Sequence, residues 1–463
     1  MKSMMTLINT LEKTDHGPYC SEFDWDNKVL PRAVKDKLKK YGLEKTCVTD
    51  NPINCDDDLA DTFFKAGYEL ALELGIYCRD TERIIKVSEE ELEASLRYAP
   101  SEITLGTGED EVVLKKRNPE DPHPPLLEAS LCITVDEDLY VPMVEGIAKN
   151  RHVDILHGPS FATIKGREVR TGTPWETLQG RYEAELRKEA LWRAGRPGMP
   201  SLAMATTNTE YSNLGGLPAL SEGNNIAISL NPPELKTTYG NIHRVVQGIN
   251  YGLYLRVACS SFIGGYAGPT EGAVLTNIAS DLLIPAVLGA HYTGSYIYDT
   301  RYFGNIGRNA LWANSVSIQA VSRNTNLMRS KIVNENAGPC TEEFLYQAAV
   351  GLMNHCVSGA ESSIQPRSAA GKYPNHITPV ECWWCGEVFK ACAGLTRKKA
   401  NEIANVLIPK YEDRLYDPPK GKSNRECFDF STFTPTKEYQ AIYNKVKQEC
   451  IDLGIPLNPA SSW

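Results

Sequence analysis

The feature that most constrains the fold is an alternation of short apolar segments with longer helical ones through most of the chain. The apolar segments predict buried strands at residues 153–156, 202–205, 226–230, 253–258, 296–298 and 331–333. Helices are predicted at residues 174–195, 238–251, 270–283 and 308–323. Strand-then-helix units imply parallel strands joined by crossover helices, so the chain is predicted to be an α/β protein. Roughly six to eight such units without a GxGxxG turn favour a TIM-type (β/α)8 barrel over a dinucleotide-binding fold.

A different pattern precedes this alternation. Residues 58–74 predict a helix, and a capping box formed by Ser88 and Glu91 begins another. Two short β segments on either side of residues 106–110 predict a hairpin, and a proline-rich loop follows at 118–125. We therefore expect three parts: an N-terminal α/β extension (1–130), the barrel (131–395) and a C-terminal helical segment packed on it (396–463).

Charge and hydropathy exclude two classes of partner. The net charge of the 463 residues is −9 and no basic block stands out, so the sequence predicts no nucleic-acid partner. The longest strongly apolar stretch, residues 282–290, is too short to span a bilayer, so no membrane association is expected. The first residues lack a secretory apolar region followed by a cleavage site, and the protein is therefore expected to be cytoplasmic.

Cysteine is the one unusual count, with 13 residues spread along the chain. Only Cys382, Cys385 and Cys392 are spaced in a way that suggests a metal site, with His376 just upstream. A structural zinc site needs a second ligand pair at matching spacing, and the sequence offers none. Buried helix cysteines beside a Trp pair are the favoured interpretation, and no metal is predicted.

Polar residues follow several of the predicted strands, where the active site of a barrel lies. Each is more often a loop cap than a catalyst. The residues are His157, Asn208, Glu210, Asn231, Cys259, Asp299, Arg301, Asn334, Glu335, Asn336 and Arg367. HExxH, GxSxG and Walker motifs are all missing from the sequence. A Schiff-base lysine is open to any barrel, but Lys331 lies at the wrong end of its predicted strand.

Aromatic residues crowd one stretch of the chain. Their ordinary role is packing in the core or at an interface. The alternative is a cage for a methylated ammonium ion, whose methyl groups would face the rings. The group comprises Tyr292, Tyr296, Tyr298, Tyr302, Phe303 and Trp312.

Several short motifs, in order and spread over nearly the whole chain, carry a family resemblance. The sequence resembles the monomethylamine methyltransferases of methanogens, the pyrrolysine-containing barrels that methylate a corrinoid protein. The resemblance implies a TIM-type barrel, a homo-oligomer and a partner corrinoid protein that docks at the barrel mouth. The motifs are FKAG (64–67), GIYC (75–78), LGTG (105–108), GRPGM (195–199), GGYAG (264–268), AGPCTE (337–342), GEV (386–388) and TPT (434–436).

The departures from this family concern the residues that activate the amine. The resemblance aligns Leu202 with pyrrolysine, Ile228 and Ala258 with two glutamates, and Ile332 with a glutamine. In the family, the pyrrolysine imine holds methylamine as an adduct, since an amine is a poor leaving group. A quaternary ammonium or sulfonium already carries the charge that lets it leave, so it needs positioning and a dry site instead.

The sequence therefore predicts a pyrrolysine-independent methyltransferase that moves a methyl group from a small pre-activated donor, such as a quaternary amine, to cobalamin on a partner corrinoid protein. One alternative is an O- or S-methyl donor, and another is a non-catalytic barrel that binds a methylated solute. An arginine such as Arg301 or Arg367 could pair with a donor carboxylate. The residues predicted to bind the substrate are Leu202, Ile228, Ala258, Tyr296, Tyr298, Asp299, Arg301, Asn334 and Glu335.

Overall fold

Parallel strand segments pair in a closed ring in the computed structural model, which describes residues 2–130, 133–203 and 209–460. Each segment pairs with the next along the chain, and the last returns to the first. The register slips by eight residues in one circuit, the shear of a (β/α)8 barrel. The segments are β5 (Leu126–Ala129), β6 (Ile155–Leu156), residues 201–202, β9 (Ile226–Asn231), β11 (Tyr254–Cys259), β13 (Tyr292–Thr293), β15 (Ser330–Ile332) and β16 (Ser362–Ile364).

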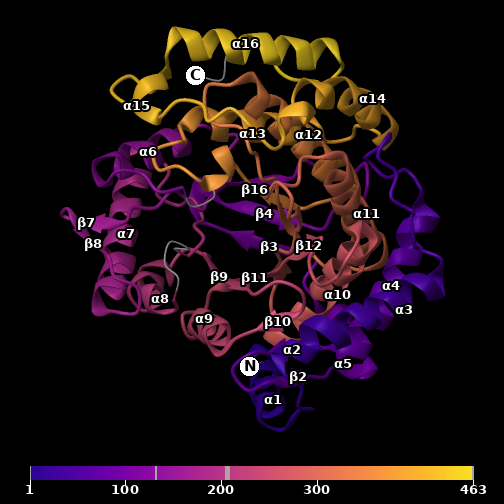
Figure 1. Ribbon diagram of the computed structural model, residues 1–463. Helices are drawn as coiled ribbons and strands as arrows, with labels where there is room; N and C mark the ends of the chain where they lie inside the picture. Colours follow the sequence, from indigo (N-terminus) through magenta and orange to yellow (C-terminus); the bar gives the residue numbers. More distant parts are fainter. Residues whose placement is uncertain (1, 131–132, 204–208, 461–463) are drawn as a thin grey trace.

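A helix follows each strand and covers the outside of the ring (Figure 1). The four helices predicted in this region are all present. Within the described part of the chain, α10 is the single helix long and apolar enough to cross a membrane, but 94% of that window is buried inside the protein. The helices are α6 (Glu137–Lys149), α7 (Pro174–Arg193), α8 (Tyr211–Gly216), α9 (Tyr239–Asn250), α10 (Thr270–Leu288), α11 (Arg308–Asn324), α12 (Glu342–Ser358) and α13 (Pro379–Ala391).

Two strands differ from the sequence prediction. The first ring strand, β5, lies before residue 130, directly after the proline-rich loop. The strand expected at 296–298 is β14 (Ile297–Asp299), which pairs with β12 (Ser261–Ile263) at the rim, whereas β13 is the ring strand. The ladder is interrupted because the Ser295 hydroxyl, and not a backbone carbonyl, accepts the N–H of Cys259.

The N-terminal extension closes one end of the barrel. The antiparallel hairpin of β3 (Glu102–Leu105) and β4 (Val112–Lys115) lies against the loops that precede the ring strands. Thr107 N–H donates to Gly198 O at 3.0 Å, and buried Arg196 pairs with Asp110 at 2.9 Å. The extension also contains α1 (Lys2–His16), α2 (Glu22–Asp24), η1 (Trp25–Val29), α3 (Leu30–Tyr41), α4 (Asp57–Leu74), α5 (Glu89–Tyr98), β1 (Ile76–Cys78) and β2 (Arg83–Ile85). β1 and β2 form a sheet with β10 (Lys236–Thr237), which comes from the barrel part of the chain.

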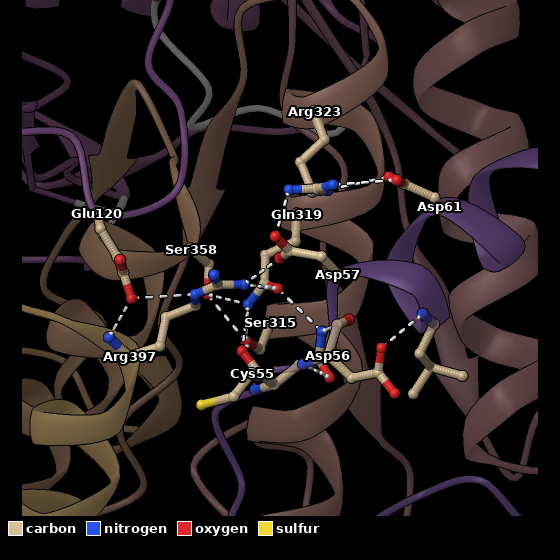
Figure 2. A network of polar contacts seen from close by, with 12 residues as sticks. Cys55, Asp56, Asp57, Asp61, Glu120, Ser315, Gln319, Arg323, Ser358 and Arg397 are labelled. Atoms are coloured by element: carbon tan, nitrogen blue, oxygen red, sulfur yellow. Dashed lines mark hydrogen bonds and ion pairs between the residues drawn. The ribbon is translucent and has the colours of Figure 1, made fainter.

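The C-terminal segment packs across α12 and α13 (Figure 1). Its elements are α14 (Arg397–Leu407), α15 (Asn424–Cys427), β17 (Phe428–Asp429), β18 (Thr434–Pro435) and α16 (Lys437–Asp452). Figure 2 shows the polar network that joins this segment to the rest of the chain. Arg397 donates to Asp57 at 2.6 Å, Gln319 at 3.0 Å and Glu120 at 3.2 Å, so one side chain links α14 to α4, α11 and the proline-rich loop.

Candidate active site at the barrel mouth

Packing against α9 shows which strand residues face the barrel interior. A Cβ on Gly248 of α9 would lie 2.6 Å from both Ala227 and Leu255, so these two side chains face the helices. Successive strand residues alternate between the two faces, and residues paired across parallel strands share a face. Ile228 and its partner Arg256 therefore point inward.

The same rule places three further predicted residues. Leu202 pairs with Ile226, which shares the face of Ile228, so Leu202 points inward and is fully buried. Ala258, two residues after Arg256, also points inward near the carboxyl end of β11. The structure thus brings Leu202, Ile228 and Ala258 together on the interior wall and makes that wall aliphatic.

A buried ion pair lies beside this wall and was missed by sequence reasoning. Glu128 of β5 and Arg256 are both fully buried, with Oε2 and Nε 3.7 Å apart. Ser362 donates to Oε1 of Glu128. Among the described residues no hydrogen-bond partner exists for the three guanidinium nitrogens of Arg256 or for the hydroxyl of Tyr292. A charged residue inside an apolar strand segment is the signal that could have identified this pair.

The aromatic residues of the predicted cage separate into different places. Tyr296 and Tyr298 contact each other with ring centroids 4.5 Å apart, and Phe262 stacks near Tyr298 at 6.4 Å. Arg367 donates to the Tyr298 hydroxyl at 3.2 Å, and burial raises the pKa of that hydroxyl. This Tyr296–Tyr298 pair lies on the β14 side of the rim.

The other aromatic residues do not join that pair. Trp312 packs edge-on against Phe63, and Tyr302 against Tyr416. Tyr292 lies on β13 in register with Arg256. The structure therefore leaves a two-tyrosine wall in place of a single cage.

Asp299 and Arg301 form a pair of their own at the rim. The Arg301 guanidinium binds both carboxylate oxygens of Asp299, at 2.9 and 2.6 Å, and Asn309 adds a further hydrogen bond at 2.8 Å. Burial acts to raise the pKa of Asp299, but the bonds from Arg301 and Asn309 outweigh it and lower the pKa. Because the guanidinium of Arg301 is already paired with Asp299, it is less available to bind the carboxylate of a methyl donor.

Asn334 and Glu335 point in different directions. The amide of Asn334 donates to Phe303 O, toward the rim. Glu335 lies behind the strand, where its charge acts on Cys382 and Cys385 of α13, and its Oε2 accepts the N–H of Arg367 at 2.9 Å. Burial raises the pKa of Glu335 to about 8. The structure thus places Glu335 away from the barrel interior, against α13.

Two further residues order the mouth. His157 follows β6, and its Nδ1 lies 2.7 Å from Ser130 O. Burial, with the charges of Arg187 and Arg256, lowers the pKa of His157 to about 3, so the ring is neutral. Buried Glu176, in the first turn of α7, accepts from Gly172 N–H and from Thr209. Asn208 lies outside the described residues.

Comparison with known proteins decides the family. The model of the family "Monomethylamine methyltransferase MtmB" matches residues 5–455. The chain belongs to the MtmB family. MtmB of Methanosarcina mazei is 29% identical over 444 residues, covering 95% of this chain and 96% of the relative. MtmB2 of Methanosarcina barkeri is 28% identical over 450 residues, with the same coverage.

A solved structure agrees with this assignment. The crystal structure of M. barkeri MtmB matches with a TM-score of 0.93 at 27% identity and covers 97% of this chain and 98% of that one. The predicted family, barrel fold and methyltransferase class are therefore confirmed. In this MtmB-family chain, Leu202, Ile228 and Ala258 of the inner wall are aliphatic.

Lys331 and the clustered cysteines lie outside the barrel interior of this MtmB-family chain. Lys331 Nζ binds Asp281 of α10 at 3.1 Å, so it faces the helices. Cys382, Cys385 and Cys392 are buried, and burial raises the pKa of each thiol. In the described part of the chain, no group of three or more His, Cys, Asp or Glu side chains could hold a metal ion.

Proposed function

We propose that the protein is a pyrrolysine-independent methyltransferase that moves a methyl group from a small quaternary ammonium or sulfonium donor to cobalamin on a partner corrinoid protein. The observation that carries the proposal is the aliphatic wall of Leu202, Ile228 and Ala258 inside a barrel of the MtmB family. Its relatives are named monomethylamine methyltransferases, and a methyl donor is therefore the substrate class that the family supports.

The chemistry of the donor explains why an aliphatic wall is suitable. A quaternary nitrogen has no lone pair, so it cannot add to an electrophile and gains nothing from one. In the transfer, the donor C–N bond breaks with its electron pair remaining on nitrogen, and a Co–C bond forms with the electron pair of cob(I)alamin. The leaving amine is neutral and needs no proton, so the protein has to hold the donor and exclude water.

Tyr296 and Tyr298 supply the contact that a methylated cation prefers. The negative face of an aromatic ring attracts a cation, by about 0.5–2 kcal/mol for each well-placed ring. Both rings lie near the rim, close to the carboxyl ends of β11 and β13. A donor held there would present its methyl group toward the mouth.

Access to the mouth supports a protein partner on the same side. The β3–β4 hairpin lies across the opposite end of the ring. At the mouth, Leu230 (47% exposed), Tyr266 (47%) and Phe303 (67%) extend from three different loops or strand ends. We propose that these apolar side chains contact the corrinoid protein, and that the enzyme acts as a cytoplasmic homo-oligomer.

The proposal is tested by following methylcobalamin formation spectroscopically. The full-length chain, its cognate corrinoid protein and cob(I)alamin are incubated with monomethylamine, quaternary amines, sulfonium compounds and O- or S-methyl compounds in turn. Transfer from a quaternary or sulfonium donor, with none from monomethylamine, is expected. Transfer from monomethylamine alone would refute the proposal. Transfer confined to neutral O- or S-methyl donors, or none at all, would also refute it.

A further inference from the structure

The guanidinium of Arg256 is buried in the barrel without the hydrogen bonds that it needs. Its three nitrogens are fully buried and have no partner among the described residues. The carboxylate of Glu128 lies nearby, with its Oε2 3.7 Å from Nε, which is beyond hydrogen-bond distance. Burying a cation without hydrogen bonds is costly in free energy. The N–H groups of the guanidinium therefore need an acceptor that the protein side chains do not supply.

The position of the guanidinium shows where that missing group would lie. A Cβ added to Gly294 would lie 2.5 Å from both Cζ and Nη2 of Arg256. Gly294 comes after Tyr292, the residue in register with Arg256, so the side chain bends toward the carboxyl ends of the strands. The guanidinium therefore lies against Gly294 on the β13 side of Arg256, whereas Ile228 of the aliphatic wall lies on the β9 side of the same residue.

The local charges indicate which chemistry fits. Glu128 and Arg256 balance each other, and His157 is neutral since its pKa is lowered to about 3. A free anion would add net charge to a buried space, which is costly. A zwitterion adds no net charge. Its carboxylate can bind the guanidinium while its cationic end lies under the tyrosines at the rim. The planar fork of arginine also matches a carboxylate in two parallel bonds.

We propose that Arg256 is the carboxylate-binding residue of the donor site and that the methyl donor is a small zwitterion with a methylated cation at one end and a carboxylate at the other. This inference rests on the proposed methyltransferase function for its choice of donor. It assigns Nη1 and Nη2 to the ligand and leaves Nε facing Glu128.

Binding calorimetry on the full-length chain tests the assignment without any corrinoid. The probes are matched pairs that differ in one group: trimethylglycine against choline, and 3-(trimethylammonio)propionate against its alcohol analogue. In at least one pair, the compound with the carboxylate should bind ten to a hundred times more tightly than the alcohol. The alcohol cannot form the charge-assisted bidentate hydrogen bonds with the guanidinium. Equal or absent binding of both members in every pair would overturn the proposal.

Variants separate a binding role from a structural one. Glu128→Gln removes the protein carboxylate that competes with the ligand for Arg256. It should therefore increase the ratio of the affinity for the carboxylate probe to the affinity for the alcohol probe, which is called the carboxylate preference below. Glu128→Gln with Arg256→Gln leaves no unpaired buried charge and should abolish the preference while choline binding is retained. Arg323→Gln is the matched control, because this arginine pairs with Asp61 on the outside of the barrel. If the double variant fails to fold, an unchanged preference in Glu128→Gln alone overturns the proposal.

The two proposals fail in different ways. A carboxylate preference that depends on Arg256, without methyl transfer from any donor, would refute the methyltransferase function and leave the binding site intact. Methyl transfer from choline and trimethylglycine at equal efficiency would refute the carboxylate site and leave the function intact. Crystals grown with trimethylglycine should show its carboxylate at Nη1 and Nη2, and ordered water there instead would count against the proposal.

Discussion

Replacing Glu335 by Gln should change how the stability of the protein depends on pH. Glu335 is fully buried behind β15, and burial raises its pKa from 4.5 to about 8. The folded protein therefore keeps the proton between about pH 4.5 and 8, whereas the unfolded chain loses it. Because the folded state binds more protons in this window, stability falls as pH rises through it.

The magnitude follows from the pKa difference. At 1.36 kcal/mol per pKa unit, a shift from 4.5 to about 8 corresponds to a loss of about 5 kcal/mol of unfolding free energy across this window. Glutamine can still accept the N–H of Arg367 and has nothing to titrate. The variant should therefore escape this loss.

Thermal unfolding of wild type and Glu335→Gln, followed by circular dichroism between pH 4 and 9, measures the effect. The difference in Tm between the two proteins should level off as the pH falls below about 4.5, because the unfolded chain then also takes up the proton. Above that, wild type should lose stability relative to the variant until about pH 8. A difference that stays constant from pH 4 to 9 would refute the reasoning, because it would mean that the folded protein ionises Glu335 as easily as the unfolded chain.

Three further substitutions probe other parts of the molecule. Arg196→Ala should cost about 1–3 kcal/mol in denaturant unfolding, because it removes the buried partner of Asp110 and leaves only the ion pair with exposed Arg151 at 3.2 Å; a loss below 1 kcal/mol would contradict this. Tyr296→Leu should weaken binding of a quaternary ammonium donor about threefold to tenfold in calorimetry, and unchanged binding would exclude the tyrosine wall. Gly294→Ala should displace the Arg256 guanidinium and reduce the carboxylate preference at least tenfold, whereas an unchanged preference would place the ligand elsewhere.

Local sequence signals were sufficient for most of the individual elements. The capping box at Ser88 and Glu91 begins α5, and the hairpin at 102–115 is present, because both depend on contacts between residues close in the chain. Glu176 shows the limit of such local signals. Its carboxylate accepts from Thr209, a residue 33 positions away, and no local pattern shows such a partner.

Part of the candidate site could also be predicted. Leu202, Ile228 and Ala258 were identified from their alignment with a family, and the ring places all three on its inner wall. The aromatic stretch could not be divided correctly, since Tyr298 packs near Phe262 at the rim whereas Trp312 packs against Phe63 of the N-terminal extension. Glu335 is adjacent to Asn334, yet Asn334 donates to Phe303 O at the rim whereas Glu335 accepts the N–H of Arg367 behind β15.

The sequence by itself determined the barrel, because the alternation of strands and helices leaves few other ways to bury parallel strands. It also determined the aliphatic character of three positions that the family resemblance singles out. Only the tertiary structure decided what lies beside them. Glu128 and Arg256 are separated by 127 other residues, and only closure of the ring brings the two charges together. The guanidinium of Arg256 keeps hydrogen-bond donors without a partner after the ring has closed. This is a result of three-dimensional packing, and no spacing along the chain encodes it.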